Sequence, residues 1–172
     1  CDADKGQTSL IIASRNGHAK VVSLLLQAEG ILVNLGAAKS SNFTALSIAS
    51  QEGHVDVVRL LLGAEGLEVN QARDDGATAL IMASIIGHVD VVRLLLGAED
   101  VEVNQAENDG RTALHLASQA GHVEVVRLLL GVEGVEVNQA RDDGSTALFI
   151  ASYKGHVDIV RLLLGAEGVE VN

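Results

Sequence analysis

The sequence is poor in several residue types that mark whole classes of protein. Its 172 residues include one cysteine, no proline and only 2% aromatic residues. A single cysteine excludes a disulfide within the chain, and no apolar run approaches the ~18 residues of a membrane span. With three aromatics and a formal net charge of -11, the chain offers little on which nucleic-acid bases could stack or phosphates could bind. We therefore expect no nucleic-acid partner, no membrane insertion and a cytoplasmic location.

What the sequence does have is a repeated aliphatic pattern. Hydrophobic residues make up 48% of the chain, and a Gly-His pair recurs at spacings of 36, 34, 34 and 34 residues. A fixed period of this length indicates stacked units, none of which can bury its apolar face alone. The predicted units form a single array and span residues 4–39, 40–73, 74–107, 108–141 and 142–172.

The third unit illustrates the structure expected of each repeat. Thr78 suits the N-cap of a short helix over residues 79–84, and Gly87 is expected to end that helix. A second helix starts near Val89 and carries valines and leucines on one broad face. Residues 101–104 alternate apolar and polar side chains, which is typical of an extended segment. Each unit is therefore predicted to run helix, turn, helix and extended finger.

These motifs resemble the ankyrin repeat family, whose unit of about 33 residues carries the same elements in the same order. The matching residues read Asp-Gly, Thr-Ala-Leu, Ala-Ser, Gly-His, Val-Val-Arg-Leu-Leu-Leu and Glu-Val-Asn. The family's histidine after its Thr-Pro-Leu appears only as His115, and each unit has one extra residue before its asparagine. The family's proline is replaced throughout, by Ser9, Ala45, Ala79, Ala113 and Ala147.

The resemblance covers the whole chain and implies both a fold and a function. The fold would be an all-α ankyrin-repeat solenoid of stacked helix-turn-helix units with extended, β-hairpin-like fingers. The function would be non-catalytic: finger tips and first helices would line a concave groove that binds a partner protein. No cofactor is implied.

A comparison of the units with one another shows which positions vary. Residues 74–104 and 142–172 are identical at 24 of 31 positions, and most of the differences fall between the turn and the Gly-His pair. The two residues just before each Gly-His pair differ most in size, charge and polarity. Residues that only packed against identical neighbours would have no reason to diverge so far, so we expect these positions to face solvent or a partner. They are Arg15-Asn16, Gln51-Glu52, Ile85-Ile86, Gln119-Ala120 and Tyr153-Lys154.

The variable positions and the few aromatics supply the predicted partner-binding residues. The expected apolar anchors are Ile85, Ile86, Phe149 and Tyr153, since exposed apolar patches and aromatics mark interfaces. Their expected polar neighbours are Gln51, Glu52, Gln119 and Lys154. Three further candidates are Arg15, Phe43 and Arg111. For Ile81 and Phe149, one turn into their helices, packing between adjacent units is an open alternative.

The junction between the first two units is irregular. Asn34 and Thr44 are ten residues apart where later units use eight, so the finger over residues 35–43 is two residues longer. Asn42 stands where the other units have a turn glycine, which is permissible because asparagine tolerates positive φ. With Phe43 beside the turn, this finger is either a recognition element or a drifted loop.

Charge is unevenly distributed along the array. Residues 1–73 hold six basic and seven acidic groups, whereas residues 74–172 hold six and sixteen, a net charge of -10. The last three units would attract a basic surface on a partner. Repeated charges also commonly form a solubilising face, so that interpretation stays open.

Catalytic and metal sites are not expected. The five histidines of the Gly-His pairs would lie one repeat apart, far beyond the ~2 Å bonds that two imidazoles need to share a zinc ion. We expect them to be hydrogen-bonded structural residues at the turn between the helices. An enzyme needs unique groups that converge on one site, and none stands outside the repeat.

Two other interpretations remain. The chain could be an excerpt of a longer array in a multidomain protein, acting as a spacer or assembly segment, because its last unit still reads Val-Arg-Leu-Leu-Leu where terminal units usually carry polar caps. Alternatively, the near-identity of the third to fifth units would suit an engineered scaffold binder, although the irregular first two units speak against it.

Overall fold

The computed structural model describes residues 8–37 and 42–171, and these contain ten α-helices in five consecutive pairs. The first helices of the pairs are α1 (Ser9–Arg15), α3 (Ala45–Glu52), α5 (Ala79–Ile86), α7 (Ala113–Ala120) and α9 (Ala147–Lys154). The second helices are α2 (Ala19–Leu26), α4 (Val55–Leu62), α6 (Val89–Leu96), α8 (Val123–Leu130) and α10 (Val157–Leu164).

The first helices begin and end where their capping residues dictate. Thr78 Oγ1 accepts a hydrogen bond from the Ile81 amide at 3.3 Å, so one amide at the start of α5 is satisfied as predicted. Gly87 ends α5 in the left-handed conformation, at φ +91°, and its amide donates to Ala83 O at 2.9 Å. The other first helices have the same threonine N-cap. Helix positions were therefore encoded locally, and their prediction is confirmed.

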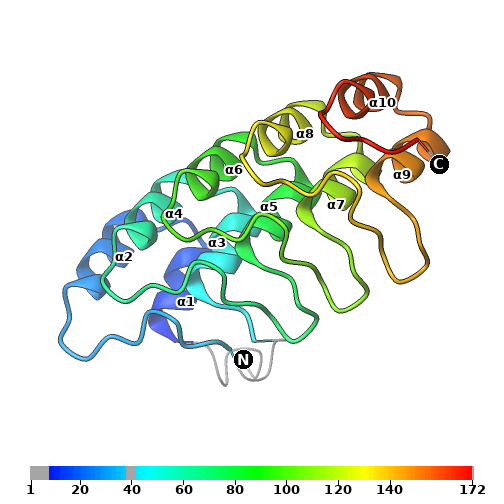
Figure 1. Cartoon of the computed structure of the whole chain (residues 1–172). Helices are drawn as coiled ribbons and strands as arrows, with labels where there is room; N and C mark the ends of the chain where they lie inside the picture. Colours follow the sequence, from blue (N-terminus) through cyan, green and yellow to red (C-terminus); the bar gives the residue numbers. More distant parts are fainter. Residues whose placement is uncertain (1–7, 38–41, 172) are drawn as a thin grey trace.

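The helices form two rows with the fingers on one side (Figure 1). The odd-numbered helices stack on one another in one row and the even-numbered helices stack in the other. Each first helix also packs against the second helix of its own pair. The loops that join consecutive units project as fingers from the side of the odd-numbered helices. Every unit thus packs on the units before and after it, as expected for a solenoid.

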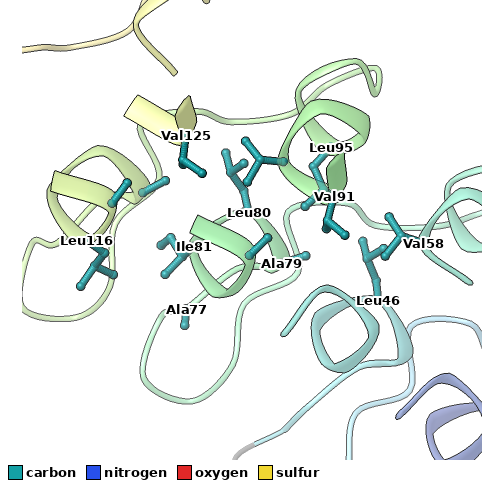
Figure 2. Close-up of a cluster of buried hydrophobic side chains, with 14 of the residues drawn as sticks. Leu46, Val58, Ala77, Ala79, Leu80, Ile81, Val91, Leu95, Leu116 and Val125 are labelled. Atoms are coloured by element: carbon teal, nitrogen blue, oxygen red, sulfur yellow. The ribbon is translucent and has the colours of Figure 1, made fainter. Parts of the chain in front are cut away.

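The core is aliphatic and continuous between units (Figure 2). Val91 and Leu95 of α6 are fully buried, and Leu80 of α5 is 4% exposed. Ile81 is directed from α5 toward the next unit, which carries Leu116. Side chains from successive units therefore share one interior, which explains how a chain with almost no aromatics fills its core.

Asparagine side chains tie each loop to the next one along the array. Asn70 donates to Asp100 O at 2.6 Å and accepts from the Glu102 amide at 2.9 Å. Asn104 does the same with Gly134 O and the Glu136 amide, at 2.7 and 2.9 Å. The amide group thus acts as a bridge between backbones of neighbouring repeats and fixes their register.

The segment around these asparagines is less extended than predicted. Val103 is buried and Glu102 is exposed, as the alternation indicated, but Val103 and Asn104 form a turn in which the Gln105 amide donates to Glu102 O at 3.2 Å. The prediction of an extended run over residues 101–104 was wrong for its second half. The turn places the Asn104 side chain against the next unit, where it makes the two bridging hydrogen bonds.

The fingers are hairpin-like but, among the described residues, carry only isolated antiparallel bridges. One joins Ala37 to Phe43 and the other joins Ala106 to Thr112. Asn42 adopts φ +58°, as its replacement of a turn glycine predicted. Part of the longer first finger, residues 38–41, lies outside the described residues, so its prediction as recognition element or drifted loop stays open.

Candidate partner-binding surface

The two positions before each Gly-His pair lie at the carboxyl ends of the first helices. We call these residues the variable row: Arg15, Asn16, Gln51, Glu52, Ile85, Ile86, Gln119, Ala120, Tyr153 and Lys154. All of them are exposed or half-buried, so the expectation that they face outward agrees with the structure. Because the odd-numbered helices stack side by side, the row runs along the whole array.

The backbone of the variable row is held by histidines of the following units. His54 Nε2 donates to Arg15 O at 2.8 Å, and His88 Nε2 donates to Gln51 O at 2.9 Å. The same bond joins His122 to Ile85 O and His156 to Gln119 O, at 3.1 and 3.2 Å. The interpretation of the Gly-His histidines as structural hydrogen-bonding residues is confirmed for these four, whereas His18 of the first unit is exposed. Since each histidine bonds only to a backbone carbonyl, the side chain at that position can vary without loss of the hydrogen bond between units.

Ile85 and Ile86 form an apolar patch near the middle of the row. Their side chains are 36% and 49% exposed. Met82, one helical turn before Ile86, is half-buried, and its Sδ lies 3.3 Å from the guanidinium of Arg73 on the finger. Residues four apart share one face of a helix, so Met82 and Ile86 lie on the side of α5 that faces the finger. The apolar patch therefore adjoins the fingers.

Met82 and Arg73 were not among the predicted site residues. A signal for Met82 existed, since it is one of the seven positions that differ between the third and fifth units. Nothing in the sequence indicated Arg73, because its contact with Met82 depends on how the finger folds back over the helix.

The finger tips carry carboxylates that are partly paired with arginines. Arg73 pairs with Asp75 at 3.0 Å and Arg141 pairs with Asp143 at 3.6 Å. Arg111, a predicted site residue, pairs with both Glu107 and Asp109 at 2.8 Å. The exposed carboxylates of the tips outnumber the arginines, so the finger edge of the third to fifth units is net acidic. The tip aspartates are Asp74, Asp75, Asp109, Asp142 and Asp143.

The environment of the third finger, around residues 106–111, shifts two carboxyl pKa values in opposite directions. Burial raises the pKa of Glu107 above its usual range, although the charge of Arg111 acts against this. Desolvation acts to raise the pKa of Asp109, but hydrogen bonds with Arg111 and the charges of Arg111 and Arg141 together lower it. Arg111 is thus committed to holding this finger together.

Phe43 lies at the base of its finger. Its carbonyl oxygen accepts from the Ala37 amide at 2.9 Å, and its ring is half-buried against the core. The guanidinium carbon of Arg73 lies 4.0 Å from the ring centroid, which is a cation–π contact between neighbouring fingers. The sequence had placed Phe43 beside the turn of the longer first finger. The structure places the ring between two units, where it supports Arg73.

Tyr153 and Phe149 lie at the far end of the array. Tyr153 is 79% exposed, and the Lys154 ammonium lies 5.9 Å from its ring centroid. Phe149 is 60% exposed, although the equivalent residues of the other four units are at most 2% exposed. Those residues are Ile11, Ser47, Ile81 and His115. The alternative left open for this position is thus resolved differently in two units: Ile81 packs between units, and Phe149 does not.

His115 occupies this inter-unit position in the fourth unit and is structural. Its Nδ1 lies 2.8 Å from Thr112 Oγ1 and accepts from the Thr112 amide at 3.3 Å, which completes a capping box at the start of α7. Burial lowers the pKa of His115. The bond from the amide requires an unprotonated Nδ1, so the neutral ring suits the folded state.

Within residues 8–37 and 42–171, no group of three or more His, Cys, Asp or Glu side chains is arranged to hold a metal ion. No helix in the same ranges is long and apolar enough to cross a membrane.

Stacked helix pairs and fingers, joined between units by the histidine–carbonyl bonds and the asparagine bridges, define a helical repeat protein. The family model for ankyrin repeats matches residues 1–73, 65–141 and 100–172, three overlapping matches that together cover the chain. The chain belongs to the ankyrin repeat family. Members of this family are generally protein–protein interaction modules and are generally non-enzymatic. The comparison with curated proteins finds no match.

Proposed function

We propose that this ankyrin array is a non-catalytic module that binds a partner protein in the groove between its variable row and its fingers. The observation that carries the proposal is the exposed pair Ile85 and Ile86. The fold uses the backbone of Ile85 and leaves both side chains outside. Contiguous exposed apolar side chains mark interaction sites.

The rigidity of the array supports binding at this surface. Each variable residue is held in register by its own helix, and the carbonyls of Gln51, Ile85 and Gln119 are fixed by histidines of the next units. A preorganised surface loses little conformational entropy when it binds. Gln51, Glu52 and Gln119 flank the apolar pair and would supply polar contacts at its rim. Arg15 lies farther along the same row.

The charge of the fingers indicates the chemistry of the partner. An apolar floor at Met82, Ile85 and Ile86 adjoins fingers on which tip aspartates outnumber arginines. A partner segment with an aliphatic or aromatic side chain flanked by lysines or arginines would complement both features. We propose such a basic surface as the partner for residues 74–172, within the cytoplasm, and we propose no nucleic-acid ligand and no catalytic role.

The test is affinity capture with matched baits, followed by mapping of the contact. Wild-type chain and an Ile85→Glu variant would be used to capture proteins, which mass spectrometry would identify. Any candidate would then be titrated in pure form against both baits. We expect Ile85→Glu to abolish binding. Helicity and Tm should stay close to wild type, because the side chain at position 85 is solvent-accessible.

A control separates loss of the site from added charge. Val157→Glu introduces the same carboxylate at a residue that is 59% exposed and lies outside the variable row. This variant should bind the partner as wild type does. Equal binding by wild type and Ile85→Glu, or equal loss in Ile85→Glu and Val157→Glu, would overturn the proposal.

A further inference from the structure

Met82 is the only methionine of the chain, and its side chain lies at the edge of the core. The residues at the same position of the second, fourth and fifth units, Ile48, Leu116 and Ile150, are 3%, 1% and 6% exposed. Met82 is half-buried, as is Ile12 of the first unit. Part of the Met82 side chain is therefore accessible to small solutes, which would not reach the buried residues of the other units.

The thioether of Met82 is in contact with a firmly held cation. Arg73 Nη1 donates a hydrogen bond to Met82 Sδ at 3.3 Å. The same guanidinium pairs through Nη2 with Asp75 at 3.0 Å, and its carbon lies 4.0 Å from the centroid of the Phe43 ring. The Arg73 side chain is only 15% exposed. Arg73 is therefore a fixed, charged donor placed against the sulfur.

The hydrogen bond between Arg73 and Met82 is weaker than its donor allows. A thioether sulfur is a weak acceptor, whereas hydrogen bonds from a charged donor to an oxygen are among the strong ones. An oxygen added to Met82 Sδ would lie within reach of Arg73 Nη1 and would accept a stronger bond. We propose that Met82 is an oxidation site whose sulfoxide Arg73 stabilises, and that this oxidation weakens binding in the groove. The effect on binding rests on the function proposed above.

The oxidant is hydrogen peroxide, and the reaction is a transfer of one oxygen atom to sulfur. A lone pair of Met82 Sδ attacks one oxygen of the peroxide. The S–O bond forms as the O–O bond breaks, so the sulfur is oxidised by two electrons and the peroxide is reduced. The released hydroxide takes the proton of the transferred oxygen and leaves as water. The product is methionine sulfoxide, with its oxygen beside the guanidinium of Arg73.

Oxidation makes part of the groove's apolar floor polar. That floor consists of Met82, Ile85 and Ile86, of which the two isoleucines are 36% and 49% exposed. In the free chain, Arg73 and water together satisfy the sulfoxide oxygen, so the array stays folded. An apolar side chain of a partner would expel that water, and a polar atom buried without its hydrogen bonds is costly. The oxidised chain therefore binds an apolar partner segment more weakly than the reduced chain does.

Treatment of the purified chain with hydrogen peroxide tests the site without any partner. Cys1 is alkylated first, because thiols also react with peroxide. Peptide mapping by mass spectrometry should show one added oxygen on Met82, at a rate within about tenfold of that of N-acetylmethionine in the same solution. Oxidation should lower the Tm less in wild type than in Arg73→Leu, which lacks the charged donor. A Met82 that stays reduced while N-acetylmethionine is consumed, or an equal fall in Tm in both chains, would overturn the proposal.

Titration of the partner captured by the wild-type chain tests the effect on binding. Met82→Leu copies the fourth unit, which has Leu116 at this position, and it has no thioether to oxidise. Both chains should bind alike before treatment. After treatment and removal of the peroxide, wild type should bind about tenfold more weakly or worse, and Met82→Leu should be unchanged. An unchanged wild type, or equal loss in both chains, would overturn the regulation. Failure of Ile85→Glu to alter binding by the untreated chain would instead overturn the proposed function, and the mass and Tm measurements would still decide the oxidation site.

Discussion

His88 lies against Gly53, the turn glycine of the preceding unit, so closely that a methyl group on Gly53 would come within 2.6 Å of the His88 ring. Gly53 also has φ +75°, a backbone conformation that residues other than glycine rarely adopt. Each Gly-His pair inside the array therefore takes part in two junctions between units. Its glycine contacts the histidine of the next unit, and its histidine contacts the glycine of the previous unit.

This contact predicts different costs for the same substitution in two units. Gly53→Ala and Gly155→Ala both place alanine at a left-handed helix end, φ +75° and +76°, which costs about 1–2 kcal/mol. Only Gly53→Ala also displaces a histidine, His88, from its bond to Gln51 O. Urea unfolding should show Gly53→Ala to be less stable than Gly155→Ala by about 1 kcal/mol or more. Equal stability would mean that the histidine contact contributes nothing.

The sequence predicted the features that depend on near neighbours along the chain. Thr78 and Gly87 bound the first helix of their unit because caps act within one turn, and Asn42 could be assigned positive φ from its turn alone. Burial of Ile81 but not Phe149 could not be predicted, because it depends on whether another unit covers the position. The contact of Phe43 with Arg73 was missed for a related reason: two fingers, 30 residues apart in the chain, must fold before the ring and guanidinium meet.

Loss of an asparagine bridge should lower the stability of the whole array and also speed amide exchange at the bridged residue. Asn104→Ala removes a donor to Gly134 O and an acceptor for the Glu136 amide, which together should cost about 1–3 kcal/mol. Amide hydrogen exchange by NMR should show faster exchange at Glu136 than in wild type. The Glu102 amide, bonded to Asn70, is the internal control and should keep its protection. Unchanged exchange at Glu136 would contradict the bridge.

Core packing predicts a graded response among leucines of the second helices. Leu95 is fully buried, so Leu95→Ala should lower the free energy of unfolding by about 2–5 kcal/mol through lost contacts and a cavity. Leu24 is 68% exposed, so Leu24→Ala should change it little. Thermal and urea unfolding measure both. A Leu95→Ala variant as stable as wild type would be incompatible with the stacked core.

Stability should depend on pH through His115. Because burial lowers its pKa below the ordinary value of 6.5, the unfolded chain binds a proton at a higher pH than the folded chain does. The stabilisation is therefore complete above about pH 6.5 and declines as the pH falls toward the lower folded-state pKa. The charges that act on His115 include Arg141 and Asp109. Any variant compared with wild type must therefore retain both residues.

His115→Ser provides the matched variant, since Ser47 makes the same capping box with Thr44 in the second unit. The variant should be less stable overall because serine fills less space. Its Tm should nevertheless fall less than that of wild type between pH 7 and about pH 5. If the two Tm curves run parallel over that range, His115 does not titrate on unfolding as inferred.

Binding at the variable row is tested most directly by titrating one purified partner, obtained by capture with the wild-type chain, against four samples in parallel. These are wild type, Ile85→Glu, Ile86→Glu and Val157→Glu. A groove centred on the isoleucine pair predicts that Val157→Glu binds with the wild-type Kd, while Ile85→Glu and Ile86→Glu lose binding and keep the wild-type helicity and Tm. Wild-type Kd values for both isoleucine variants would contradict a binding surface at this pair.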